Sequence, residues 1–129
     1  MASAFSSAAY NGRLEELNIL LEQYPKLVLE KDIRSKRTAL HLAADNGHLD
    51  VVRALLVNKA QINARDKSER TPLHYATISG FPRIVELLLA NKADASPRDK
   101  FGLTPMAWAM AKPDGQVLVD ILSRYGAKK

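Results

Sequence analysis

The chain has 129 residues, of which 47% are hydrophobic, so a packed fold is expected and disorder is not. It contains no cysteine, which excludes disulfides, thiolate zinc sites and cysteine nucleophiles and is consistent with an intracellular setting, in the cytoplasm or the nucleus. The formal net charge is +5, and residues 1–5 lack the basic start and long apolar segment of a secretory signal, so we do not expect one there. No apolar run reaches the roughly 18 residues of a membrane helix, so we expect no membrane partner.

Along the chain, one short phrase occurs three times, at Thr38–Ala43, Thr71–Ala76 and Thr104–Ala109. Its threonines are 33 residues apart in both intervals (71 − 38 and 104 − 71). A fixed period of this size predicts a stack of small supersecondary units, and such stacks usually serve as binding surfaces. A degenerate first copy at Ser3–Ala8 brings the expected number of units to four, at about residues 1–31, 32–65, 66–98 and 99–129.

Each unit is predicted to hold two helices followed by a projecting turn. Thr71 followed by Pro72 is a typical helix start, because the hydroxyl caps free amides and proline loses no bond at the first helical position. Gly47 and Gly80 are expected to end the first helices in the left-handed conformation. Tyr75 and Trp108 share an apolar position of the phrase, which predicts packing in the core.

The second helices are predicted from apolar pairs at helical spacing. The pairs taken as equivalent are Val51–Val52, Ile84–Val85 and Val117–Leu118, and then Leu55–Leu56, Leu88–Leu89 and Ile121–Leu122. Before the last of these helices, Lys112-Pro113-Asp114-Gly115 replaces the simple glycine stop, and Asp114 is predicted to cap the helix.

This pattern resembles that of the ankyrin repeat family, over essentially the whole chain. The match rests on an aspartate before the threonine, on Thr71-Pro72-Leu73-His74-x-Ala76, and on the closing Gly126-Ala127. The resemblance implies an all-α fold, an α-solenoid of stacked helix-turn-helix repeats with projecting turns, in one domain of residues 1–129. Lys59, Lys92 and Glu69 stand where the family has glycine, so their turns are expected to carry a small strain.

No enzyme chemistry is predicted. In the ankyrin pattern, histidines such as His41 and His74 bond to the threonine and to backbone near the next connector, and His48 follows a helix-ending glycine. All three histidines therefore have repeat positions, which leaves none for a catalytic base or a metal ligand. The sequence has no phosphate loop, nucleophile elbow or paired-histidine zinc motif, so neither a cofactor nor a metal is expected.

The net charge is concentrated in the three turns that precede the threonines. These turns hold nine basic and four acidic residues, a difference equal to the whole net charge of +5. Stacking places equivalent residues about 8–10 Å apart, so Lys31, Arg65 and Arg98 are expected to form a ladder with Arg34, Lys67 and Lys100 beside it. Asp32, Asp66 and Asp99 are expected to turn inward and accept backbone amides.

The predicted function is protein–protein binding by a monomer, through the concave side, with an acidic or phosphorylated protein segment as the favoured partner. The predicted contact residues in the turns are Ile33, Arg34, Lys36, Arg37, Arg65, Lys67, Arg70, Arg98, Lys100 and Phe101, and those on the inner helices are Asp45, Asn46, Ile78, Ser79 and Lys112. Ile33 and Phe101 are apolar residues at turn tips; Phe101 is either an interface anchor or packed against the neighbouring turn.

Three other interpretations stay open. The same basic ladder could associate with nucleic acid, although aromatic residues for base stacking make up only 6% of the chain. The chain could be an engineered or selected ankyrin binding scaffold. The turn charges could also be ordinary surface charge that keeps the protein dispersed.

Overall fold

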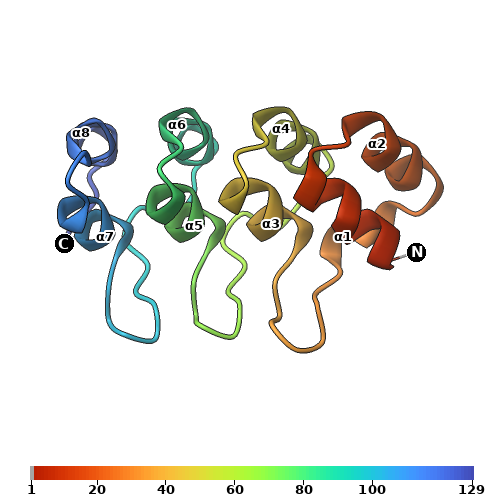
Figure 1. Ribbon diagram of the computed structural model, residues 1–129, viewed down its shortest axis with the longest axis horizontal. Coiled ribbons are helices and arrows are strands. Elements are labelled where there is room, and N and C mark those ends of the chain that lie inside the picture. Colours follow the sequence, from red (N-terminus) through yellow and green to blue (C-terminus); the bar gives the residue numbers. More distant parts are fainter. Residues whose placement is uncertain (1) are drawn as a thin grey trace.

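The computed structural model describes residues 2–129, and over that range it consists of helix pairs with no strand. The pairs are α1 (Ala2–Asn11) with α2 (Leu14–Gln23), α3 (Ala39–Asp45) with α4 (Leu49–Val57), α5 (Pro72–Ser79) with α6 (Pro82–Ala90), and α7 (Pro105–Ala111) with α8 (Gln116–Arg124). The odd-numbered helices form one row and the even-numbered helices a second row, and the connectors project beyond the first row as hairpin turns (Figure 1). The expected α-solenoid is therefore confirmed.

The inner helices begin as the phrase predicts. The side chains of Thr38, Thr71 and Thr104 each accept a hydrogen bond from the amide three residues further on. Gly47 and Gly80 follow α3 and α5 with φ angles of 77° and 81°, in the left-handed region where glycine avoids the cost of a side chain. Local chemistry is thus sufficient to start and stop these helices.

The connector between α2 and α3 contains an element that the pattern does not predict. Pro25–Leu29 forms a short 3-10 helix, η1, whose Leu27 and Val28 are buried against the core. Proline at its first position suits a helix start, because its missing N–H would have had no partner there. This part of the connector therefore adds to the core.

The register predicted for the last helix is wrong by one residue. α6 begins at residue 82 and α8 at residue 116, an interval of 34 (116 − 82). The α7–α8 loop, residues 112–115, is two residues longer than the α5–α6 loop, residues 80–81, while α7 is one residue shorter than α5. Leu118 rather than Val117 therefore occupies the buried position of Ile84, and Val117 is 58% exposed. Asp114 does not cap α8, since Gly115 stands at the N-cap and no side chain bonds there.

The core runs along the stack between the two rows of helices. Leu55, Leu88 and Leu122 occupy the same position in α4, α6 and α8, and all three are fully buried. Tyr75 is buried as expected, whereas Trp108 is only half-buried. The difference arises because α5 has inner helices on both sides, while α7 has α5 on one side only.

Within residues 2–129, four residues other than glycine adopt positive φ, and three of them stand at the expected positions. Lys59 (φ 68°) and Lys92 (φ 69°) follow α4 and α6 at the place that Gly126 (φ 77°) occupies after α8. Glu69 has a φ of 58°, and the fourth residue is Lys36 in the first turn. The strain expected from the missing glycines therefore has a backbone basis.

Replacing Lys59 and Lys92 by glycine is expected to stabilise the protein by about 0.5–1 kcal/mol each, because glycine removes the left-handed penalty. Urea denaturation followed by circular dichroism measures this change. Lys26→Gly, in η1 with negative φ, is the control and is expected to be neutral or destabilising. A double variant no more stable than the wild type would contradict the interpretation.

Candidate functional site

Each turn is organised by an aspartate that accepts backbone amides at 2.8–3.0 Å. Asp66 and Asp99 accept the amides two and four residues ahead, and Asp32 accepts those two and three residues ahead. Asp66 and Asp99 are buried, as expected, but Asp32 is exposed. The first turn has six residues from Asp32 to Arg37 where the others have five, which changes its geometry.

Arg37 is held against the following repeat rather than presented to solvent. Its Nε lies 3.5 Å from Asp66 Oδ2, and its Nη2 donates to the Tyr75 hydroxyl at 2.9 Å. The guanidinium also lies over the Tyr75 ring, 4.4 Å from the centroid. The Tyr75 hydroxyl donates to Asp66, so the three side chains form one closed group.

Arg70 repeats this arrangement in the next interval. Its Nε lies 3.3 Å from Asp99 Oδ2, and the guanidinium carbon lies 5.0 Å from the Trp108 ring centroid. The Trp108 Nε1 donates to the same carboxylate oxygen at 3.0 Å. Burial by itself raises the pKa of Asp99, but the amide of Leu103, the indole and the guanidinium outweigh it, and the pKa lies below its ordinary value.

Arg65 and Arg98 bind backbone. Arg65 Nη1 donates to the carbonyl of Glu69 in its own turn and to that of Arg98 in the following connector, at 3.1 and 2.7 Å. Arg98 bonds in the same way to the carbonyl of Gly102 at 2.8 Å. Lys31, at the corresponding place before the first turn, makes no such bond within residues 2–129.

The turns are also joined to one another. The Lys67 amide donates to the Ser35 carbonyl at 2.8 Å, and the Lys100 amide donates to the Ser68 carbonyl at 3.0 Å. The basic side chains of successive turns are therefore carried on a bonded row of backbone. Five exposed cations of this row form neither an ion pair nor a side-chain hydrogen bond in the described part of the chain, namely Lys31, Arg34, Lys36, Lys67 and Lys100.

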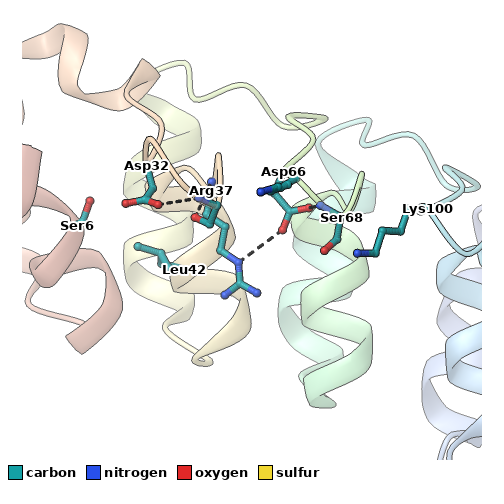
Figure 2. A pocket seen from close by; sticks show the side chains of 9 residues that line it. Ser6, Asp32, Arg37, Leu42, Asp66, Ser68 and Lys100 are labelled. Carbon is teal, nitrogen blue, oxygen red and sulfur yellow. Dashed lines mark hydrogen bonds and ion pairs between the residues drawn. The ribbon is translucent and has the colours of Figure 1, made fainter.

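A hollow of about 550 Å³ lies where the first two turns meet the inner helices. It is lined by Ser6, Asp32, Ser35, Arg37, Leu42, Asp66, Lys67, Ser68 and Lys100. In Figure 2, Arg37 reaches across to Asp66, and Lys100 points toward Ser68 from the next turn. The serines were not among the predicted contact residues, although Ser35 and Ser68 are 33 residues apart and a search for the period could have found them.

The predicted contact residues of the inner helices connect neighbouring repeats. The Ser79 hydroxyl donates to Asp45 at 2.6 Å, and Lys112 Nζ donates to the Ile78 carbonyl at 2.9 Å. Asn46 instead bonds within its own helix, to the carbonyl of Leu42. Asp45, Ser79, Ile78 and Lys112 therefore link neighbouring inner helices.

Two apolar side chains stand at the turn tips. Ile33 is 93% exposed and Phe101 is 64% exposed. Phe101 lies near two cations, 5.3 Å from Lys100 Nζ and 5.9 Å from the Arg70 guanidinium carbon, measured to the ring centroid. Packing against the neighbouring turn therefore covers only a minor part of Phe101.

His41 and His74 are buried and bonded within the repeat pattern. The Thr38 amide donates to His41 Nδ1 at 3.0 Å, so Nε2 carries the proton and donates to the Arg70 carbonyl at 2.9 Å. His74 makes the same pair of bonds with Thr71 and Leu103. Burial lowers the pKa of both histidines, which favours the neutral ring that these bonds require.

Two further features concern the described range, residues 2–129. It contains no group of three or more histidine or acidic side chains placed to hold a metal ion. None of its helices has the length and apolar character that crossing a membrane requires.

Comparison with known proteins identifies the repeat. A family model described as ankyrin repeats (3 copies) matches residues 5–99 and again residues 64–129. Two rice proteins named as probable E3 ubiquitin-protein ligases, XBOS32 and XBOS33, are 38% and 40% identical over 60 residues, which is 46% of this chain. The Arabidopsis thaliana serine/threonine-protein kinase VIK is 48% identical over 48 residues, 37% of the chain. The matched part spans only 11–12% of each of these relatives.

Proposed function

The chain belongs to the ankyrin repeat family, and we propose that it binds an acidic or phosphorylated segment of another protein on the basic surface of its turns. Ankyrin repeats are in general protein–protein interaction modules, and the fold is not itself catalytic. The ligase and kinase names of the relatives describe proteins that share only a short stretch with this chain.

The observation that carries the proposal is the concentration of unpaired cations on one bonded row of turns. Arg37 and Arg70 are neutralised by buried aspartates, and Arg65 and Arg98 are held by carbonyls. The exposed cations that remain, Lys31, Arg34, Lys36, Lys67 and Lys100, come from all three turns. We call these five residues the turn cations.

The turn cations suit an anionic segment for two reasons. Exposed charges of one sign attract an oppositely charged partner at a distance and discriminate against basic ones. Four of the five are lysines, whose ammonium groups act as point charges and tolerate carboxylate or phosphate in several orientations. Phe101 at the end of the row offers an apolar contact beside them.

Charge reversal tests this proposal. The variant Arg34→Glu/Lys67→Glu/Lys100→Glu should bind a fluorescent polyglutamate peptide at least about tenfold more weakly than the wild type, as measured by fluorescence anisotropy. Arg65 and Arg98 are left unchanged because they hold backbone. Wild-type affinity should fall as salt is added, since exposed charges are screened.

The matched control reverses three cations on the other row of helices. Arg13, Arg53 and Arg83 are exposed beside or on α2, α4 and α6, and their reversal changes the net charge by the same amount. This control should keep its affinity within about twofold. Equal weakening by both variants would mean that overall charge governs binding, and preferential binding of duplex DNA over the peptide would favour a nucleic-acid partner instead.

A further inference from the structure

We propose that Ser35 is a phosphorylation site, modified by an ATP-dependent kinase that selects serine between basic residues, and that its phosphate blocks the turn cations. The blocking effect rests on the proposed function, whereas the site itself rests on how the first turn is built. The comparison that supports it lies within this chain, between the turn of Ser35 and the turn of Ser68.

The two serines share basic neighbours at two positions. Each has a basic residue directly before it, Arg34 or Lys67, and an arginine two residues after it, Arg37 or Arg70. Both border the same hollow. The residue directly after the serine differs, because Lys36 follows Ser35 and Glu69 follows Ser68. A kinase that phosphorylates both free peptides at similar rates therefore isolates the effect of turn structure from the effect of sequence.

The turn of Ser68 is closed by side chains. The Asp66 carboxylate accepts not only the Ser68 and Arg70 amides but also the Tyr75 hydroxyl, and it is paired with Arg37. Arg65 bonds across the turn to the Glu69 carbonyl. Opening this turn would expose a buried, fully bonded carboxylate, which is a costly step.

The turn of Ser35 lacks these contacts. Leu42 stands where Tyr75 stands in the next repeat and has no donor for Asp32, whose carboxylate is exposed and accepts the Arg34 and Ser35 amides. The Ser35 hydroxyl accepts the Arg37 amide at 3.2 Å, a bond that lies within the same turn. Lys31 stands at the position of Arg65, whose guanidinium bonds across the second turn to the Glu69 carbonyl. Segments with exposed hydrogen bonds and few buried contacts open most easily, so Ser35 can be presented to a kinase in extended form.

The chemistry is an ordinary phosphoryl transfer. The Ser35 Oγ attacks the γ-phosphorus of ATP, the bond from that phosphorus to the bridging oxygen breaks, and ADP leaves. The hydroxyl proton passes to a base of the kinase. The product carries about two negative charges at Ser35 at neutral pH.

Those charges would act on both the turn and the binding surface. The Ser35 amide lies 2.8 Å from an oxygen of the Asp32 carboxylate, so a phosphate there meets a like charge and weakens the turn. It also borders the hollow that Lys67 and Lys100 line, where it can pair with cations that an acidic partner needs. Phosphorylation should therefore compete with the acidic segment.

The test uses the whole protein and a serine kinase chosen because it phosphorylates free peptides of residues 30–40 and 63–73 at similar rates. Mass spectrometry then measures phosphate on each serine of the folded chain. Ser35 should be modified at least about tenfold faster than Ser68, because only its turn opens readily. Equal rates, a faster Ser68, or no modification of Ser35 would overturn the site.

Binding of the polyglutamate peptide gives the second readout. The phosphorylated protein should bind at least about tenfold more weakly, Ser35→Glu should weaken binding in part, and Ser35→Ala should leave it unchanged. Unchanged affinity after phosphorylation of Ser35 would overturn the regulatory part. If the unmodified protein does not bind the peptide at all while Ser35 is still modified selectively, the proposed function fails and the phosphorylation site stands.

Discussion

Replacing Leu88 by alanine is expected to lower the free energy of unfolding by about 2–5 kcal/mol, through lost apolar burial and the cavity that remains. Leu88 is 0% exposed in α6, and α4 and α8 pack on either side of that helix. Because the same position is occupied by Leu55 and Leu122 in those helices, the substitution breaks a continuous row of leucines. Chemical denaturation followed by circular dichroism measures the loss.

Val57→Ala is the matched control for Leu88→Ala. Val57 ends α4 with 76% of its surface exposed, so its truncation should change the stability by no more than about 0.5 kcal/mol. Comparable losses from the two substitutions would contradict the assignment of Leu88 to the packed row. A loss at Leu88 within experimental error would contradict the helix register itself.

Replacing Asp99 by alanine is expected to destabilise the protein by about 3–5 kcal/mol, the usual consequence of removing one partner from a buried ion pair. The substitution removes the acceptor of the Phe101 and Leu103 amides and of the Trp108 indole. It also leaves the half-buried Arg70 guanidinium without its carboxylate. Thermal or urea unfolding measures the effect.

Asp32→Ala is the matched control for Asp99→Ala, because it removes a turn carboxylate that is exposed rather than buried. Asp32 is exposed and accepts only two amides, so its removal should cost about 1 kcal/mol. Equal costs at Asp32 and Asp99 would contradict the distinction between the first turn and the third turn, and would weaken the case for selective opening at Ser35.

The stability that Asp99 contributes is expected to depend on pH. Its pKa is lower in the folded protein than the ordinary value of 3.8, so the ionised group stabilises the fold above that pH. As the pH falls below about 4, the unfolded chain takes up the proton first and this stabilisation is lost. The difference in stability between the wild type and Asp99→Ala should therefore shrink in acid.

Much of the fold was predictable because its determinants lie close together in the sequence. A threonine followed by proline starts α5 and a glycine ends it, and each effect needs only the few residues that share the hydrogen bonds. The positions of strain at Lys59 and Lys92 follow from the same period. Repetition then extends one predictable unit along the chain, which is why the stacked fold was evident.

The register of α8 could not be predicted in this way. Both Val117 and Leu118 are apolar, so either residue satisfies the helical pattern. The length of the preceding loop decides which of them is buried, and that length matters only once α8 is packed beside α6. Packing against α6, rather than local helix preference, therefore determines that Leu118 is the buried residue.

The roles of the basic residues were decided by tertiary structure as well. Sequence alone placed Arg37 and Arg70 among the predicted contact residues of the turns, but they pair with aspartates 29 residues further on (66 − 37 and 99 − 70). Those partners belong to the next repeat and to buried positions beside Tyr75 and Trp108. Charge is a property of a residue, whereas its availability to a partner depends on which neighbours the stack brings within bonding distance.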